Sequence, residues 1–133
     1  MLRTSIFIIS FVVSSMLSVN AAAQSTENNF VDIEKALKTG DAESFSNLFC
    51  ELIDIDILGD ANIYSKNQAK QIVKKFFTKY TPKNFTFIHQ SGKGKVQYGI
   101  GRLSAGGENF RVTIFLQDLG NKYAIHQIRI EKN

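Results

Sequence analysis

The sequence predicts an α+β domain in which helices precede an antiparallel sheet, and three observations lead to this class. Apolar residues recur at helical spacing in two segments of the N-terminal half. Four segments of the C-terminal half are instead rich in β-branched and aromatic residues and are separated by short turns that contain glycine. The single proline, Pro82, stands between the last helical pattern and these segments, where it prevents the helix from continuing. Helices and hairpin-linked strands segregated in this way are typical of the α+β class.

Residues 1–23 differ in composition from the rest of the chain. Arg3 gives the first residues a positive charge, residues 6–19 are dominated by apolar side chains, and three alanines end at Ala23. That order is typical of a cleavable secretory signal peptide. The apolar run is shorter than the roughly 20 residues that span a bilayer. We therefore expect cleavage after Ala23, export to the periplasm or the extracellular space, no membrane span afterwards, and one domain over residues 24–133.

Charge and cysteine content restrict the remaining possibilities. The chain has 16 Lys and Arg against 12 Asp and Glu, a formal net charge of +4, and the lysines are scattered. A nucleic-acid-binding protein usually concentrates its basic residues on one face, so we expect no nucleic-acid partner. Cys50 is the only cysteine, which excludes an internal disulfide. We expect it to be a buried, inert thiol, although a reactive thiol and an intermolecular bridge are alternatives.

Two helices are expected at the start of the domain. The first begins with the apolar pattern at Phe30 and ends at Gly40, which tolerates the positive φ of a helix C-terminus. Asp41 is a suitable N-cap for a second, short helix over residues 42–49. After it, isoleucines alternate with Asp54 and Asp56 from residue 53 to residue 57, which predicts an edge strand with one solvated face.

A turn and a short return strand at residues 63–64 lead to the clearest helix in the chain. Ser65 and Gln68 have the spacing of a capping box, and the helix is expected over residues 66–80. Four strands joined by short turns should then form an antiparallel meander. Their expected ranges are 85–91, 95–104, 109–118 and 122–132.

This order of elements is similar to that of the nuclear-transport-factor-2-like (cystatin-like) cone, in which a curved sheet wraps around a long helix and encloses a pocket. Local sequence also resembles a family of short exported bacterial domains of unknown function, over essentially the whole mature chain. The segments that carry this resemblance are ILGDANIYSKNQA at 57–69, FTFIHQ at 85–90, YGIGRL at 98–103, FRVTIFL at 110–116 and IRIEK at 128–132. The resemblance implies the fold and export, and it implies no activity, because the cone fold is shared by enzymes, binding modules and assembly subunits.

The two histidines, His89 and His126, are the candidates for acid–base chemistry. One of them could pair with Asp54 or Asp56 inside the cone, as the His–Asp pairs of cone-fold hydro-lyases and isomerases do. Hydrogen-bonded sheet histidines and solvated carboxylates are the alternative interpretation. The histidine spacing favours no metal site, and the glycines at residues 92–95 form a hairpin turn rather than a phosphate loop. We expect neither a metal nor a cofactor.

Arginines on three successive strands, with nearby tyrosines, indicate an anionic ligand or a peptide as the alternative to catalysis, because a guanidinium donates two parallel hydrogen bonds to a carboxylate or phosphate. Arginines that extend into solvent are the other interpretation. The candidate ligand-binding residues are His89, Tyr98, Arg102, Arg111, His126 and Arg129. Tyr64 and Tyr123 are further hydroxyl donors.

Strand alternation assigns faces to the last two strands. Phe110, Val112, Ile114 and Leu116 share the expected core side of theirs. In the final strand, Ala124, His126, Ile128 and Ile130 fall on one face, opposite Tyr123, Ile125, Gln127 and Arg129, and the sequence leaves open which face lines the pocket. Phe115 lies opposite the core side, so both sheet faces are partly apolar, which suggests a homodimer through the outer face.

The function expected from these observations is a non-catalytic exported module that binds a small ligand or an exported protein. The alternatives are a small cone-fold enzyme with a His–Asp pair and an interaction domain that docks into an envelope assembly.

Overall fold

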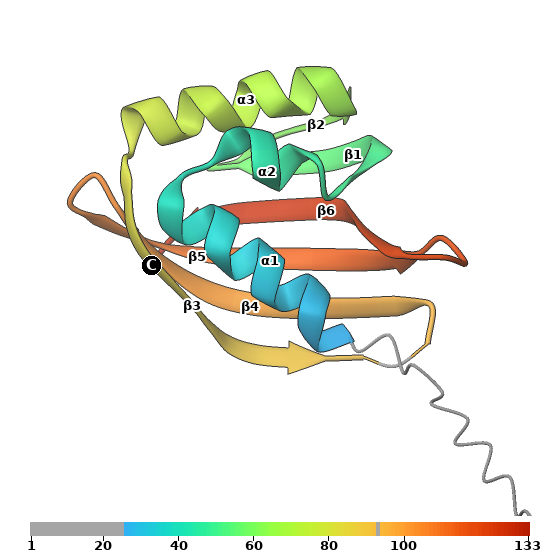
Figure 1. The fold of residues 1–133 in the computed structure, drawn as a ribbon. Coiled ribbons are helices and arrows are strands. Elements are labelled where there is room, and N and C mark those ends of the chain that lie inside the picture. The colour runs from blue at the N-terminus through green and yellow to red at the C-terminus, as the bar shows by residue number, and fades with distance from the viewer. Residues whose placement is uncertain (1–25, 93) are drawn as a thin grey trace, which may run out of the picture.

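The computed structural model describes residues 26–92 and 94–133, and the expected signal peptide and its cleavage site after Ala23 lie outside the described residues. The described part contains three helices and six strands (Figure 1). The helices are α1 (Thr26–Thr39), α2 (Ala42–Ser46) and α3 (Lys66–Lys79). The strands are β1 (Phe49–Ile57), β2 (Asp60–Ser65), β3 (Pro82–Ser91), β4 (Val96–Ala105), β5 (Glu108–Asp118) and β6 (Tyr123–Lys132). No helix in these ranges is both long and apolar enough to cross a membrane.

Local capping sets the end of α1 and the starts of α2 and α3, as the sequence predicts, whereas α1 begins at Thr26 rather than at the expected Phe30. Gly40 has a φ of +67° directly after α1, a conformation that costs glycine little. Asp41 is the N-cap of α2, and its carboxylate accepts a hydrogen bond from the Ser44 N–H at 3.0 Å. Both hydrogen bonds of the Ser65–Gln68 capping box are present at the start of α3. The expected end of α2 at residue 49 is wrong, because Phe49 already belongs to β1.

All six strands of the described chain form one sheet in the order β2-β1-β6-β5-β4-β3. Strands β3 to β6 are antiparallel neighbours in sequence order, whereas β1 pairs in parallel with β6. The expected four-stranded meander with a separate strand pair is therefore wrong as a description of the sheet. The expected edge position of β1 is also wrong, since β1 lies between β2 and β6. Pairing between strands so distant in sequence leaves no local signal.

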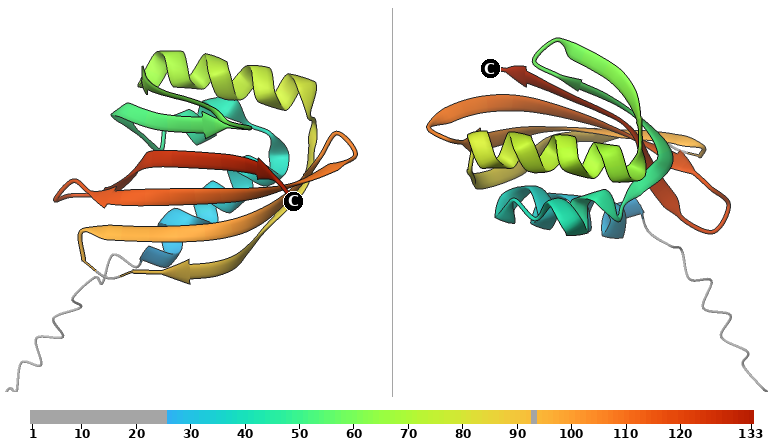
Figure 2. Two further views of the ribbon diagram at one scale, coloured as in Figure 1. Left: turned by 180° about the vertical axis from the view of Figure 1, so that it is seen from behind. Right: turned by 90° about the horizontal axis from the view of Figure 1, so that it is seen from above.

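The helices cover one face of the twisted sheet (Figure 2). Buried apolar side chains fill the space between the helices and the sheet. On α3, Phe76 contacts the Phe110 ring of β5 edge to face, with centroids 5.3 Å apart. Phe45 of α2 contacts Phe49 in the same way at 5.0 Å. The largest fully buried side chains include Phe45, Phe85, Phe110, Ile33, Leu37, Ile53, Leu103 and Leu116. This is a packed apolar core on the helix side of the sheet, where the resemblance implied a pocket.

Two bulges decide which side chains reach the opposite, uncovered face. Phe115 of β5 is paired with Gln127 of β6, and Leu116 of β5 is paired with Ile125 of β6. His126 is therefore an extra residue in β6. The bulge restarts the alternation, and Ile125, Ile128 and Ile130 are all buried while Arg129 is exposed. The expected grouping of His126 with Ile128 and Ile130 is therefore wrong. In β3, Phe87 is paired with Gly101 and His89 with Ile100, so Ile88 is the extra residue there.

Candidate functional site

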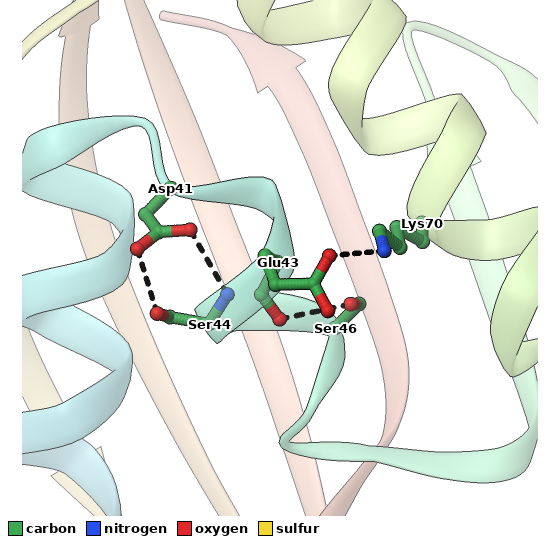
Figure 3. A network of polar contacts seen from close by, with 5 residues as sticks. All are labelled: Asp41, Glu43, Ser44, Ser46 and Lys70. Carbon is green, nitrogen blue, oxygen red and sulfur yellow. Dashed lines mark hydrogen bonds and ion pairs between the residues drawn. The ribbon is translucent and has the colours of Figure 1, made fainter.

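The polar groups around α2 serve the fold rather than a ligand (Figure 3). Asp41 accepts hydrogen bonds from the Ser44 N–H at 3.0 Å and from the Ser44 hydroxyl at 2.6 Å. The hydroxyl bond, with the N–H bond second, lowers the pKa of the Asp41 carboxyl below its ordinary value. Glu43 forms an ion pair with Lys70 of α3, and the Ser46 hydroxyl donates to the Glu43 carbonyl oxygen at 3.0 Å. These contacts fix α2 against α3. One groove lies between α1 and α2, and another lies between α2 and α3.

The sheet face that the helices leave uncovered carries a row of four rings, one from each strand of the β3–β6 segment. Neighbouring ring centroids are 5.7 Å apart for His89 and Tyr98, 5.9 Å for Tyr98 and Phe115, and 6.1 Å for Phe115 and His126. We call these four residues the ring row. Because the rings follow one another across adjacent strands, they form a continuous aromatic strip, with each ring within the usual contact range of the next.

Three arginines lie on the same face beside the ring row, in two different environments. Arg129 of β6 pairs with the Asp56 carboxylate of β1, Nε to Oδ2, at 3.6 Å. Arg102 of β4 and Arg111 of β5 are directly opposite each other in register and are exposed. Within residues 26–92 and 94–133, no ion pair involves either of these two. Two cations therefore stand side by side, and although Glu131 of β6 is the register neighbour of Arg111, no ion pair joins them in the described residues.

A depression of about 400 Å³ adjoins this arginine pair. Its walls include the apolar side chains of Ile88 and Ile100 together with His89, Arg102 and Arg111. Further lining comes from Gly101 and Asn133. Ile88 is 59% exposed, because alternation from the buried Phe85 places it on the uncovered face. The bulge at this residue brings His89 onto the same face. The depression thus combines two guanidinium groups, an imidazole and apolar carbon in one place.

In the described residues, neither histidine is bonded to the carboxylates proposed as its partners. His89 Nε2 lies 3.4 Å from the Tyr98 hydroxyl. The Asp56 carboxylate accepts from the Gly59 N–H at 3.0 Å and pairs with Arg129. In the part of the chain that is described, no hydrogen bond or ion pair joins either histidine to Asp54 or Asp56. Nor do three or more His, Cys, Asp or Glu side chains gather there in an arrangement that could hold a metal ion.

Comparison with known proteins identifies the family. The sequence model of a domain of unknown function, DUF4783, matches residues 30–131. The chain belongs to this family. A DUF4783 protein from Bacteroides uniformis is 29% identical, with a TM-score of 0.75 over 77% of this chain and 95% of its own. One from Bacteroides ovatus is 31% identical, with a TM-score of 0.74 over 77% of this chain and 93% of its own.

A more distant crystal structure shows the fold alone. An NTF-2-like protein of unknown function from Silicibacter pomeroyi is 11% identical, with a TM-score of 0.61 over 80% of this chain and 92% of its own. The resemblance to a family of unknown function with the nuclear-transport-factor-2-like fold is therefore confirmed. No curated protein matches the chain. Relatives thus give the DUF4783 domain a fold and a family, and they supply no activity.

All six of the predicted ligand-binding residues lie on the uncovered sheet face of this DUF4783 domain, on strands β3 to β6. The two further tyrosines do not join them. Tyr64 packs against the core, and the Tyr123 hydroxyl donates to the Gly94 carbonyl oxygen at 3.0 Å. Sequence reasoning did not include Ile88 and Ile100 in the site. Alternation could have revealed both, because Ile100 alternates with buried residues along β4 and Ile88 alternates with Phe85 and Phe87 along β3. The face of His89, in contrast, depends on the bulge.

Cys50 of the DUF4783 domain is half-buried rather than buried, so the expected full burial of this thiol is wrong. Partial burial raises its pKa, while the positive charges of Lys122 and Lys66 oppose that effect. A raised pKa reduces the thiolate fraction at neutral pH, which keeps the thiol a poor nucleophile.

Proposed function

We propose that the mature chain, residues 24–133, is an exported binding module without catalytic activity and that its uncovered sheet face is the binding surface. The observation that carries this proposal is the distribution of side chains between the two sheet faces. The helix side is filled by apolar residues, whereas the uncovered side presents the ring row and the arginine pair. The signal-like composition of residues 1–23 supports export.

Binding is favoured over catalysis by what surrounds the titratable groups. A hydro-lyase or isomerase needs a base, a group that orients the base, and a cavity within hydrogen-bond reach of both. His89 has a tyrosine hydroxyl as its partner, and His126 has the Phe115 ring beside it. Neither arrangement supplies the carboxylate that would orient and support an imidazole base. Aromatic rings and exposed arginines are instead the residue types that most often anchor ligands and partners.

A second copy of the chain is the second candidate occupant, since exposed apolar residues and charge both favour it. Ile63 on β2 is 65% exposed and Val96 on β4 is 55% exposed. Their strands lie toward the two opposite edges of the sheet. Acidic side chains lie on β1, whereas the unpaired arginines lie on β4 and β5. A two-fold axis between the copies would place each basic half over an acidic half, as a self-complementary interface requires. A homodimer through this face is therefore the alternative to a small ligand.

Probe mapping of the secreted protein tests the location of the binding surface. The full chain would be expressed in a secreting bacterium, and intact mass would show whether cleavage follows Ala23. Phenol and 2-propanol would then be titrated into the isotope-labelled protein by nuclear magnetic resonance. We expect amide shifts confined to β3–β6 around the ring row. Shifts confined to the grooves between α1 and α2, or between α2 and α3, would place the binding surface elsewhere and reject the proposal.

Sedimentation velocity over a range of protein concentrations distinguishes the two occupants. A homodimer predicts a dimer that Phe115→Ser converts to monomer, while Val31→Ser leaves it intact. Val31 is the matched control because it is 60% exposed on α1, away from the sheet face. A monomer at every concentration excludes the second copy and leaves the small ligand as the occupant.

A further inference from the structure

We propose that the depression beside Arg102 and Arg111 is a site for an organic carboxylate, with the two guanidinium groups holding the anion and the isoleucines holding its apolar body. This inference rests on the proposed binding function and adds the chemical class of the ligand. It is carried by the pairing of the two arginines, by the composition of the depression and by the hydrogen bond of His89.

The arginine pair is an arrangement that an anion would stabilise. Residues directly opposite each other in neighbouring antiparallel strands have Cβ atoms about 4.5–5.5 Å apart, so like charges there repel. Glu131 is the register partner of Arg111 on β6, and Thr86 is that of Arg102 on β3. In the described ranges, neither arginine takes part in an ion pair. A carboxylate placed between two guanidinium groups would receive charge-assisted hydrogen bonds and remove the repulsion.

Arg129 lies on the same face, and its positive charge is neutralised by an ion pair within the fold. Its guanidinium pairs with Asp56, which is itself fixed by the Gly59 N–H. Its register partner on β5 is Thr113, an uncharged residue. Arg129 is therefore held by the fold, and it does not line the depression. Arg102 and Arg111 differ from Arg129 because they line the depression and form no ion pair in the described residues. We therefore assign the ligand role to these two arginines.

The remaining walls select an anion that carries an apolar group. Ile88 and Ile100 line the depression beside the arginines. The volume of about 400 Å³ falls within the range of about 300–1,000 Å³ that is usual for small-molecule sites. An inorganic anion would leave the isoleucine surface in water, whereas a carboxylate with an aromatic or aliphatic body would cover it.

His89 adds a further polar group to the lining of the depression. If the Tyr98 hydroxyl donates to His89 Nε2, which lies 3.4 Å away, the neutral ring carries its proton on Nδ1. The ring then has one nitrogen held by tyrosine and one N–H available as a donor. The two guanidinium groups and this N–H are donors, which suits an acceptor such as carboxylate, and the Asn133 amide can donate as well as accept.

Calorimetric and magnetic-resonance titrations of the secreted protein with three probes test this inference. Benzoate carries the carboxylate and an apolar ring, benzamide has the same shape without charge, and inorganic phosphate has charge without an apolar body. We expect benzoate to bind at least about tenfold more tightly than either other probe, because charge-assisted bonds are about twice as strong as neutral ones. Arg102→Gln and Arg111→Gln should each remove this preference, and the matched control Arg129→Gln should retain it.

The outcomes separate this inference from the proposed function. Equal binding of benzoate and benzamide at the ring row would overturn the carboxylate class and leave the binding surface in place. Phosphate binding as tight as benzoate would overturn the role of the isoleucines. A lack of shifts on this face with all three probes, and with phenol, would overturn both proposals.

Thermal unfolding without any ligand provides a second measurement. Because the paired arginines repel each other, Arg102→Gln should raise Tm by a few degrees, and Arg129→Gln should not, because it breaks the pair with Asp56. A lower Tm for Arg102→Gln would show that the fold itself uses this arginine and would contradict the ligand role. The variant reports on the arginine pair in either case, since an exposed glutamine is compatible with a strand.

Discussion

Replacing Gly101 with alanine should destabilise the domain, because the Phe85 ring occupies the space that a side chain would need. A Cβ atom built on Gly101 would lie 2.2 Å from Phe85 Cζ, 2.5 Å from Phe85 Cε2 and 3.0 Å from the Thr86 carbonyl oxygen. The Phe85 ring is fully buried and packs edge to face on Phe87, with centroids 4.8 Å apart. It therefore cannot turn away without displacing its neighbours.

The magnitude follows from the balance of two effects. Forcing extra carbon into a packed core typically costs about 1–3 kcal/mol. Alanine restricts the unfolded chain more than glycine does, which returns about 0.4–1 kcal/mol where the backbone conformation is compatible. We expect a net loss of about 1–2 kcal/mol and a fall in Tm of roughly 5–15 °C for a domain of this size. The contact is closest at the ring, so the Phe85 side chain decides the cost.

Chemical denaturation monitored by circular dichroism would measure the change, and a double-mutant cycle with Phe85→Leu would test its cause. A smaller, flexible side chain at position 85 leaves room for the new methyl group. The destabilisation by Gly101→Ala should therefore be smaller in the Phe85→Leu background, with a coupling free energy of about 0.5–3 kcal/mol. A Gly101→Ala variant as stable as the parent, or additive effects of the two substitutions, would refute the packing argument.

Three further predictions concern the capping residues and the thiol. Ser65→Ala should cost about 1 kcal/mol in urea unfolding because it removes the N-cap bond of α3, and Ser65→Asp, which keeps a cap, should lose much less. Two Ser44 hydrogen bonds lower the pKa of Asp41 below its ordinary 3.8, so its stabilising effect is complete above about pH 4 and is lost as the pH falls through the lowered value. Asp41→Asn should therefore flatten the acid side of the stability–pH curve, and an unchanged slope would contradict the cap assignment. Because burial raises the pKa of Cys50 above the ordinary 9.0, its alkylation by iodoacetamide should increase with pH beyond that value and be slower than that of glutathione at each pH, whereas rapid labelling at neutral pH would disprove the assignment.

Elements with a local signal could be predicted from the sequence almost to the residue. The third helix was expected at residues 66–80 and is observed as Lys66–Lys79, because the capping box and the following proline act within a few residues of the helix ends. The fifth strand was expected at residues 109–118 and is observed as Glu108–Asp118. Glycine-containing turns on both sides limit it, and its alternation indicated the buried side correctly.

Features that depend on distant pairing could not be predicted in this way. The parallel partner of β1 is β6, some seventy residues later in the chain. The local composition of either strand does not identify the other as its partner. The bulges at Ile88 and His126 likewise shift a face without any glycine or proline to mark them. The candidate site shows both limits. Residue chemistry identified the arginines, tyrosine and histidines, whereas only the three-dimensional register showed that they share the uncovered face.

The position of β6 between β1 and β5 also determines when the sheet can be completed during folding. The last strand of the described chain is inserted between β1 and β5, and its parallel partner β1 is among the first elements to be made. Until Tyr123–Lys132 is available, the sheet consists of two separate pieces with unpaired edges facing each other. Pairings over such long separations close slowly, because the chain entropy is lost before the contacts form. The ten residues of β6 are thus the part of the chain that completes this sheet.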